Sequence, residues 1–331
     1  MMSFHNHITE ILPLIGQHTD SVELIKQGND VFRLVSGTDH YFLKTYTKSW
    51  YGSDPATTGF HVIHESTAWA ILARHGLRAP TVVYATPNSD NPISRPFLLT
   101  RELEGRPFTD WLMEADQKTQ DTLLNVVGDY LRQMHEITFE FPGYLSTLRG
   151  PPEPPDPAGW QHRCWSAKTR QVEAWKQIQA DNADLTEVTR IEAQQACSQI
   201  SSRLMNAYLP PRFTHGDCHA HQFFLVRNRA GWQITGVLDM EVSSAGDSGE
   251  DLLKISLELA QGLDHKTRWW EALFAGYGVA PDFEAFRLRL LGVAPVEYGF
   301  LGKWVQTPNR EAMMRRLLQA KDWMSLFEPI L

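Results

Sequence analysis

Hydrophobic and polar residues alternate in short runs through the first hundred positions, which is typical of strands. The predicted strands cover residues 22–25, 31–35, 40–46, 80–85 and 96–101. The segments between them are rich in glycine, asparagine, aspartate and proline, which favour turns. One helix is predicted over residues 61–75, because Gly76 stands where a helix favours glycine at its end.

From about residue 102 onward the apolar residues recur at intervals of three and four, which indicates helices. The predicted helices cover residues 118–137, 185–208, 249–262, 266–277, 282–291 and 309–327. Segment 150–157 has proline at five of its eight positions, so we expect an extended surface loop there. A β-rich first part followed by a mainly helical second part predicts an α+β protein, and 331 residues are enough for two lobes.

Two acidic residues flank a predicted β-hairpin in the second part. Asp217 precedes the first hairpin strand, residues 223–226, and Asp239 follows the second, residues 232–238, so the two acids are 239 − 217 = 22 residues apart. Because a hairpin returns the chain on itself, we expect both carboxylates at one end of it. Two such acids suit a kinase, in which one receives a hydroxyl proton and the other holds Mg²⁺. The alternative is that each is only a turn or cap residue.

Lys44 lies at the end of an alternating strand, on the same face as Phe42. A lysine that points toward an aromatic side chain needs a partner, and Glu65 in the following helix is the best candidate. Such a pair would hold the ammonium group against nucleotide phosphates. The alternative is a solvated lysine at the edge of a sheet.

Composition excludes some classes of function. The net charge of −8 argues against a nucleic-acid partner. No apolar run reaches the ~18–20 residues that span a bilayer, and the N-terminus lacks a secretory pattern. Three scattered cysteines argue against a disulfide framework, so we expect a cytoplasmic protein.

Evidence for zinc or hydrolase chemistry is weak. Cys218, His219 and His221 lie within four residues, but these three have neither a Cys-x-x-Cys nor a His-x₃-His spacing among them to support a zinc site. A Gly-x-Ser-x-Gly elbow is missing, which argues against a serine hydrolase. The turn at Gly28 would cover phosphates with backbone amides or simply join two strands, and its single glycine leaves both open.

These features together resemble the aminoglycoside phosphotransferase and choline kinase-like family, which has a protein-kinase-like fold. The first motif reads His215-Gly216-Asp217 and ends at Gln222, and the second reads Val237-Leu238-Asp239-Met240-Glu241 with Gly246-Asp247 after it. Residues 97–105 resemble the hinge between the lobes, and Leu131–His135 resembles a helix that ends in Leu-His. The resemblance extends from about residue 22 to residue 259.

The resemblance implies a bilobal fold, with a small β-rich nucleotide-binding lobe over residues 1–100 and a large, mainly helical catalytic and acceptor-binding lobe over residues 101–331. It implies transfer of the γ-phosphoryl group of ATP or GTP to a hydroxyl group of an aminoglycoside-, choline- or sugar-like acceptor.

The same resemblance implies roles for single residues. Asp217 would be the base, with His215 bracing its loop, and Asp239 would bind Mg²⁺. Lys44 would contact the phosphates, and Glu65 would orient it. Thr100, Glu102 and Leu103 would hold the adenine through the backbone, whereas Asp247 and Asp251 would brace the catalytic loop and the helix after it.

Gln222 departs from the family, which has asparagine at this position. Both amides offer a carbonyl oxygen to a metal, but glutamine carries one more methylene group. Gln222 would therefore ligate Mg²⁺ with an altered loop, or leave a second ion to Glu241 or water, or end catalysis. We expect retained activity, with a nucleotide-binding pseudokinase as the main rival hypothesis. Two further hypotheses are adenylyl transfer to a protein and zinc-dependent hydrolysis that uses His219 and His221.

Overall fold

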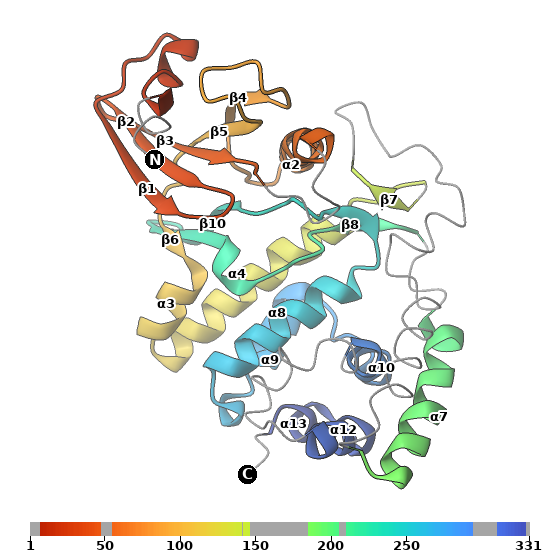
Figure 1. Cartoon of the computed structure of the whole chain (residues 1–331). Coiled ribbons are helices and arrows are strands. Elements are labelled where there is room, and N and C mark those ends of the chain that lie inside the picture. The colour runs from red at the N-terminus through yellow and green to blue at the C-terminus, as the bar shows by residue number, and fades with distance from the viewer. Residues whose placement is uncertain are drawn as a thin grey trace.

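The computed structural model describes residues 7–47, 55–140, 142–145, 185–204, 210–293 and 310–328. A β-sheet with one long helix forms the N-terminal part, and helices dominate the C-terminal part (Figure 1). The predicted α+β class is therefore confirmed. The proline-rich segment 150–157 lies outside the described residues.

The N-terminal sheet contains the five predicted strands in the order β1–β2–β3–β5–β4, with all neighbours antiparallel. The strands are β1 (Ser21–Lys26), β2 (Val31–Ser36), β3 (Asp39–Thr45), β4 (Val82–Thr86) and β5 (Phe97–Arg101). Helix α2 (Pro55–Arg74) begins ahead of the predicted start at residue 61, so Glu65 lies in its middle. The sequence placed this start too late because residues 55–60 carry little apolar periodicity.

Alternation along β3 separates the two faces of this sheet. Tyr41 and Leu43 are fully buried in an apolar cluster with Leu12 of the short 3-10 helix η1 (Leu12–Ile15). Because side chains alternate along a strand, Phe42 and Lys44 point to the opposite face. Lys44 therefore faces the C-terminal part of the chain, as its contacts below show.

The C-terminal part contains two short sheets and most of the helices. The helices are α3 (Phe108–Glu114), α4 (Gln117–Glu136), α7 (Glu187–Leu204), α8 (Gly249–Gly262), α9 (Trp269–Tyr277), α10 (Phe283–Val293), α12 (Arg310–Gln319) and α13 (Trp323–Phe327). Helix α8 matches its prediction at both ends, whereas α3 was missed because it is only seven residues long.

Two predicted helices are each broken in the structure. The helix predicted over residues 266–277 is a 3-10 turn, η4 (His265–Thr267), followed by α9, because Arg268 adopts a left-handed backbone with φ 53°. The helix predicted over residues 309–327 is α12 and α13, because Asp322 caps a new helix by accepting from the Ser325 backbone N–H.

Helices α4 and α9 pack closely because glycines lie at their contact. A Cβ atom on Gly276 would lie 2.0 Å from the Asn125 carbonyl oxygen. A Cβ atom on Gly128 would lie 2.1 Å from the Leu273 carbonyl oxygen. Both approaches involve backbone, which no side-chain movement relieves. At the start of α9, Trp269 and Trp270 are buried and pack against Phe327 of α13.

The predicted hairpin is present as β9 (Phe223–Asn228) and β10 (Gly231–Val237), and β6 (Arg106–Pro107) pairs with β9. Asn228 pairs with Gly231, so the turn is shorter than the predicted run 227–231. A further small sheet has the order β7 (Gly143–Tyr144), β11 (Ser244–Gly246) and β8 (Arg212–Thr214).

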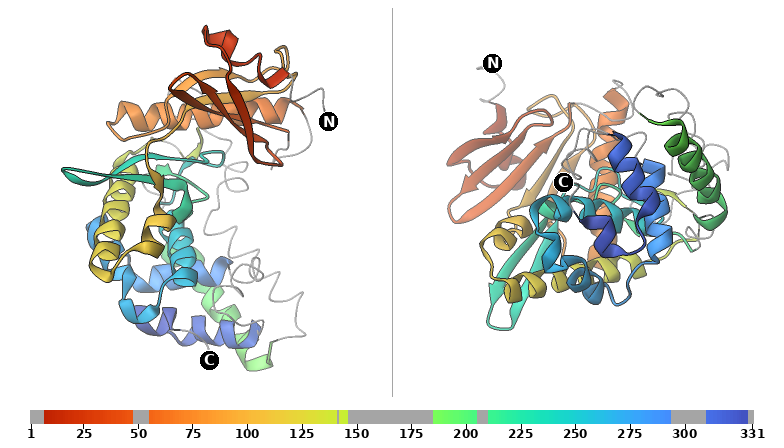
Figure 2. Two further views of the ribbon diagram at one scale, coloured as in Figure 1. Left: turned by 90° about the vertical axis from the view of Figure 1, so that its left-hand side faces the viewer. Right: turned by 90° about the horizontal axis from the view of Figure 1, so that it is seen from below.

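Helix α2 holds the segment after β10 against the N-terminal sheet. The Trp69 Nε1–H donates to the Val237 carbonyl oxygen at 2.9 Å, and His64 Nε2 lies 2.7 Å from the Ser243 carbonyl oxygen. The left view of Figure 2 shows the sheet at one end of the molecule and the C-terminal helices at the other, with α2 between the sheet and the hairpin. Segment 238–242 is thereby placed where the two parts of the chain meet.

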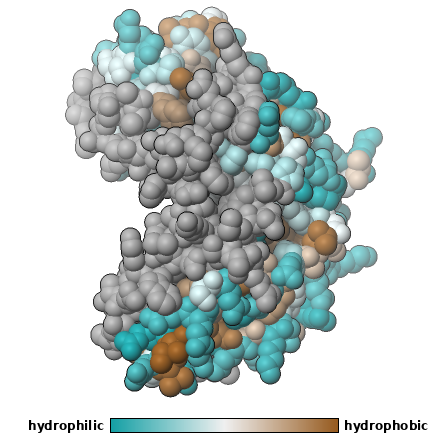
Figure 3. Space-filling view, turned by 90° about the vertical axis from the view of Figure 1, so that its right-hand side faces the viewer, coloured by the Kyte–Doolittle hydropathy of each residue, from teal (hydrophilic) through white to brown (hydrophobic). Residues whose placement is uncertain are grey.

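The mean hydropathy of the chain is −0.33. On the face shown in Figure 3, most described residues are hydrophilic, with hydrophobic residues near the top and at the lower edge. Among the described residues, no helix combines the length and apolar character needed to cross a membrane.

Candidate active site

Lys44 of β3 lies among three carboxylates. Its Nζ atom is 3.0 Å from Glu65 Oε2, 2.8 Å from Asp239 Oδ1 and 2.5 Å from Glu241 Oε1. The Lys44–Glu65 pair expected from strand alternation is therefore present. Lys44 also pairs with Asp239, the acid at the end of the hairpin. Burial lowers the pKa of Lys44, but Glu65 and its other neighbours raise this pKa well above its usual value, so the ammonium form persists.

Glu65 is the most buried of the three acids, with 1% of its side chain exposed. Its Oε2 accepts a hydrogen bond from the Tyr46 hydroxyl at 2.5 Å, and its Oε1 accepts from the Met240 N–H at 3.2 Å. Burial raises the pKa of Glu65 to about 7 although Lys44 lowers it, because Glu241 and Asp239 add to the rise. Three carboxylates around one ammonium thus leave an excess of negative charge.

Asp239 has a left-handed backbone with φ 65°, which turns its carboxylate out of the strand direction. The side chain is 39% exposed. Burial raises the pKa of Asp239, but Lys44, then His215 and Lys26, lower it below its usual value. The influence of Lys26 places the end of β1 near this carboxylate.

Asp217 belongs to the loop between β8 and η3 (Ala220–Gln222). Gly216 precedes it with φ 80°, and a Cβ atom there would lie 2.3 Å from the Val242 carbonyl oxygen, so only glycine fits. His215 Nε2 lies 2.8 Å from the Leu238 carbonyl oxygen. This contact joins the loop of Asp217 to the residue immediately before Asp239, as the hairpin prediction requires.

Asp251 of α8 holds the same loop from beneath and is completely buried. Its Oδ2 accepts from the His215 N–H at 2.6 Å and lies 3.1 Å from His135 Nε2. Its Oδ1 accepts from the Gly216 N–H at 2.9 Å. Burial raises the pKa of Asp251, but the hydrogen bond from His135 and the charges nearby lower it below its usual value.

Asp217 is flanked by two cationic groups. Lys254 Nζ lies 2.6 Å from Asp217 Oδ1, and His219 Nε2 lies 3.4 Å from the same atom. Burial raises the pKa of Asp217, but the hydrogen bond from His219 and the charge of Lys254 lower it well below its usual value. Asp217 is therefore ionised at neutral pH.

Asp247 braces the helix rather than the loop. Its Oδ2 accepts from Arg289 Nε at 2.9 Å and from Arg289 Nη2 at 2.7 Å, and its Oδ1 accepts from the Gly249 N–H at 2.9 Å. The arginine connects the start of α8 to α10. The residue thus supports the element that carries Asp251.

Gln222 is buried, and its side chain points back along its own loop. Its side-chain Oε1 atom accepts from the His219 backbone N–H at 2.7 Å, and its backbone carbonyl oxygen accepts from the Leu238 N–H at 3.0 Å. The additional methylene of glutamine gives the reach for this internal hydrogen bond. The Oε1 atom keeps a second lone pair, so a metal ligand role needs that lone pair or a turn of the side chain.

The segment after β5 is partly engaged in the sheet. The Glu102 N–H donates to the His40 carbonyl oxygen at 2.9 Å, and the Glu102 carboxylate binds Arg33 at 2.9 Å. The Thr100 hydroxyl donates weakly to the Phe42 carbonyl oxygen at 3.5 Å. Within the described residues the Leu103 N–H makes no hydrogen bond, which leaves this amide available to a ligand.

A sequence model of the phosphotransferase enzyme family matches residues 22–289, which is most of the chain. The chain belongs to this family. The predicted enzyme class, a phosphotransferase with an alcohol group as acceptor, is confirmed. No curated protein matches the sequence closely enough to count as a relative.

Solved phosphotransferases share the fold of this chain at low sequence identity. The GDP complex of aminoglycoside 2'-phosphotransferase-IIIa is 15% identical with a TM-score of 0.59, and the alignment covers 96% of this chain and 98% of that one. The streptomycin–ATP complex of APH(2")-IIa is 18% identical with a TM-score of 0.53, covering 96% and 98%. APH(3'')-Id from Streptomyces rimosus is 17% identical with a TM-score of 0.54, covering 89% and 98%. The bilobal, protein-kinase-like fold is confirmed.

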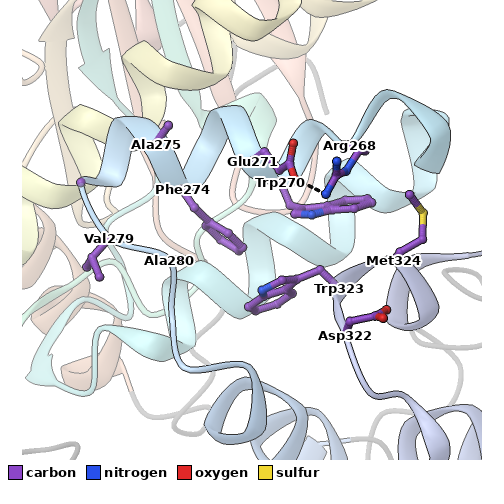
Figure 4. Close-up of a pocket in the computed structure, with 11 residues that line it drawn as sticks. Arg268, Trp270, Glu271, Phe274, Ala275, Val279, Ala280, Asp322, Trp323 and Met324 are labelled. Atoms are coloured by element: carbon purple, nitrogen blue, oxygen red, sulfur yellow. Dashed lines mark ion pairs between the residues drawn. The ribbon is translucent and has the colours of Figure 1, made fainter.

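A separate cavity lies on the phosphotransferase between α9 and α13 and has a volume of about 520 Å³. Figure 4 shows Trp270, Phe274 and Trp323 facing it, with an Arg268–Glu271 ion pair at its rim. None of the candidate catalytic residues lines this cavity. It is therefore distinct from the site that contains Asp217.

Sequence reasoning missed two residues of the site, Lys254 and Glu258. Together with Asp251 they recur at intervals of three and four along α8, so they share one face of that helix. The signal available was a row of polar residues along a helix whose other buried residues are mostly apolar. It is weak, because such a row usually faces solvent.

Proposed function

We propose that this phosphotransferase transfers the γ-phosphoryl group of ATP or GTP to a hydroxyl group of a small molecule. The observation that carries the proposal is the meeting of Lys44 with Asp239 at 2.8 Å, 195 residues apart in sequence. Strand, helix and hairpin thereby bring a phosphate-binding cation and a cation-binding acid to one point. We keep the division into a nucleotide lobe (1–100) and a catalytic lobe (101–331) as part of this proposal.

The nucleotide is proposed to bind between the sheet and the hairpin. Lys44, oriented by Glu65, binds the phosphates, and the backbone from Thr100 to Leu103 holds the base. The Leu103 N–H suits this role because it has no acceptor in the described part of the chain. The neighbouring Glu102 amide is already bonded to His40, so base recognition rests on Leu103 more than on Glu102.

Mg²⁺ fits the acids around Lys44. One oxygen from each of Glu65, Asp239 and Glu241 lies within 4.8 Å of the others, and hard carboxylate oxygens are the ligands that Mg²⁺ prefers. Asp239, which is the most exposed of the three, is the proposed ligand. Gln222 is proposed as a second ligand through its side-chain amide oxygen. When bound, the ion neutralises charge on the phosphates.

Asp217 is proposed to receive and orient the acceptor hydroxyl. The acceptor oxygen forms the new bond to phosphorus, its proton passes to Asp217, and the nucleoside diphosphate leaves with the electrons of the broken P–O bond. The low pKa of Asp217 suits orientation followed by late proton transfer, because this chemistry depends on positioning more than on basicity. His215 holds the loop through its contact with Leu238.

The acceptor class is proposed by analogy. The structural neighbours include enzymes in complex with kanamycin or streptomycin, so an aminoglycoside-, choline- or sugar-like molecule is the first class to test. A nucleic-acid partner is not expected at a net charge of −8. A cytoplasmic location stays a prediction.

A catalytically impaired pseudokinase is the second candidate. The observation that favours it is the hydrogen bond between Gln222 Oε1 and the His219 N–H, which turns the amide oxygen toward its own loop. Such a protein binds nucleotide without turnover. Activity that appears only in Gln222→Asn would favour the pseudokinase.

The test is phosphate transfer from radiolabelled ATP and GTP to a panel of hydroxylated amines and sugars. We expect transfer by the native chain, and a loss of at least ~100-fold in Asp217→Asn with nucleotide binding retained. Asp121→Asn, an exposed acid on α4, is the control and should keep full activity. Native-like transfer by Asp217→Asn would refute the assignment of the base.

A further inference from the structure

Beside Asp217, three metal-binding side chains converge that the phosphotransfer reaction does not use as a set. His219 and His221 come from the catalytic loop, and Glu258 comes from α8. One ligand atom from each of the three lies within 4.8 Å of the other two. Only tertiary packing brings them together, because Glu258 is 37 residues beyond His221.

The three side chains are already arranged around a common point. His221 Nδ1 lies 2.9 Å from Glu258 Oε1, and His219 Nδ1 lies 3.4 Å from Glu258 Oε2. The two imidazole rings are stacked, with centroids 5.4 Å apart and planes inclined by 24°. The Ala220 N–H donates to Glu258 Oε2, which holds the carboxylate in place.

These separations suit a tetrahedral metal ion. Metal–nitrogen and metal–oxygen bonds of about 2.0–2.2 Å at tetrahedral angles place neighbouring ligand atoms about 3.3–3.5 Å apart. The observed 3.4 Å between His219 Nδ1 and Glu258 Oε2 already has this value, whereas His221 Nδ1 lies 2.9 Å from the other oxygen, Oε1, so His221 has to turn toward an ion held by Oε2. The exposed ring of His221 allows this movement, since 57% of its side chain is accessible.

The outer contacts of His219 are those of a metal-binding imidazole. While its Nδ1 faces Glu258, its Nε2 faces Asp217 Oδ1 at 3.4 Å. A ligating histidine almost always donates its other ring N–H to a carboxylate or carbonyl group, which sets the tautomer. Asp217 supplies such an acceptor here, and the ion would replace the Nδ1 proton that His219 shares with Glu258 in the metal-free protein.

We propose that His219, His221 and Glu258 form a binding site for Zn²⁺ or a similar transition-metal ion, with water as the fourth ligand. Two imidazoles and one carboxylate with an open position are a ligand set that zinc accepts. Mg²⁺ prefers oxygen ligands, so the nitrogen donors separate this site from the acids around Lys44. The site adjoins the catalytic base and would make that base sensitive to the metal.

The experiment is titration of the metal-free protein with Zn²⁺ in competition with a chromophoric chelator. We expect the native chain to bind one ion that His221→Ala binds at least ~10-fold more weakly. Glu258→Gln should show the same loss, and Asp217→Asn should weaken binding by about 10-fold through the lost outer contact. Bound Co²⁺ should give the visible absorption of a tetrahedral ion in the native chain and lose it in His221→Ala.

His18→Ala is the matched control, because His18 is an exposed histidine paired with a carboxylate, Asp20, at 2.9 Å. It should bind Zn²⁺ like the native chain. Equal Zn²⁺ affinity in the native chain, His221→Ala and Glu258→Gln would overturn the proposal. The readout is binding, so the result is independent of whether the chain transfers phosphate.

Discussion

Replacing Asp251 with asparagine tests whether α8 holds the catalytic loop in place. The carboxylate is fully buried and accepts hydrogen bonds from two successive backbone amides and an imidazole. Asparagine has nearly the same shape but carries no charge and offers only one acceptor atom. The change therefore removes charge and one acceptor without creating a cavity.

The expected cost follows from these contacts. With the asparagine oxygen at the Oδ2 position, the bonds from His215 and His135 persist but lose their charge, at about 1 kcal/mol each. The amide NH₂ then faces the Gly216 N–H, which loses its acceptor. Leaving this buried N–H unsatisfied costs about 1–3 kcal/mol. The total of about 3–5 kcal/mol agrees with the usual cost of breaking a buried charged network.

The assay combines thermal unfolding, hydrogen exchange and kinetics. We expect Tm to fall by about 4–7 °C, because 331 residues with an unfolding entropy of about 2.1 cal/mol/K each give a shift of about 1.4 °C per kcal/mol. Exchange should rise in a peptide covering residues 212–224, because this loop is what Asp251 holds. Since misplacing a catalytic group by about 1 Å costs about 100-fold, kcat should fall by ~10- to 100-fold while the nucleotide KM changes little.

The control is Asp129→Asn, which removes a surface ion pair with Arg132 on α4 and should change stability by less than ~0.5 kcal/mol. A native Tm together with native exchange in the loop peptide would show that Asp251 is not the brace. A fall in Tm with unchanged kcat would show that bracing does not control the position of Asp217.

Further predictions address the cation, the pH dependence and the packing. Lys44→Met should reduce phosphate transfer by at least ~100-fold, because the ammonium group proposed to neutralise phosphate charge in the transition state is lost, a fold-change that corresponds to about 3 kcal/mol; unchanged transfer would contradict its role. The pKa of His219 is raised to about 9 by hydrogen bonds to two carboxylates. Its contribution to stability is therefore complete below pH ~6.5 and is lost progressively as the pH rises to ~9; His219→Gln in chelator should lack this fall in its Tm profile. Gly276→Ala should destabilise by more than ~4 kcal/mol through the clash with Asn125, whereas Gly262→Ala, with open space around it, should not lower Tm.

The parts of the site that lie on regular elements could be predicted from the sequence. Strand alternation was enough to place Lys44 inward and to name Glu65 as its partner. Strand patterning around a polar turn was enough to predict the hairpin between Asp217 and Asp239. Both inferences used short-range periodicity, which residues report without knowledge of the rest of the fold.

The parts that depend on side-chain direction or on single backbone angles could not be predicted. The left-handed conformation of Arg268, which separates η4 from α9, is rare for a residue with a side chain, so no pattern announces it. The inward turn of Gln222 depends on a hydrogen bond to His219, and a motif comparison sees only the change of residue.

The sequence by itself determined the N-terminal strands, the hairpin and most of the helices, the family, and the acids and lysine expected to do the chemistry, because periodicity and motifs are local. Only the tertiary structure decided what surrounds those groups. Lys254 and Glu258 reach the catalytic loop because α8 packs beneath it, and their contacts with Asp217 and His219 set the charge of the site. Such contacts join residues far apart in the chain, and their geometry depends on how all the elements pack together.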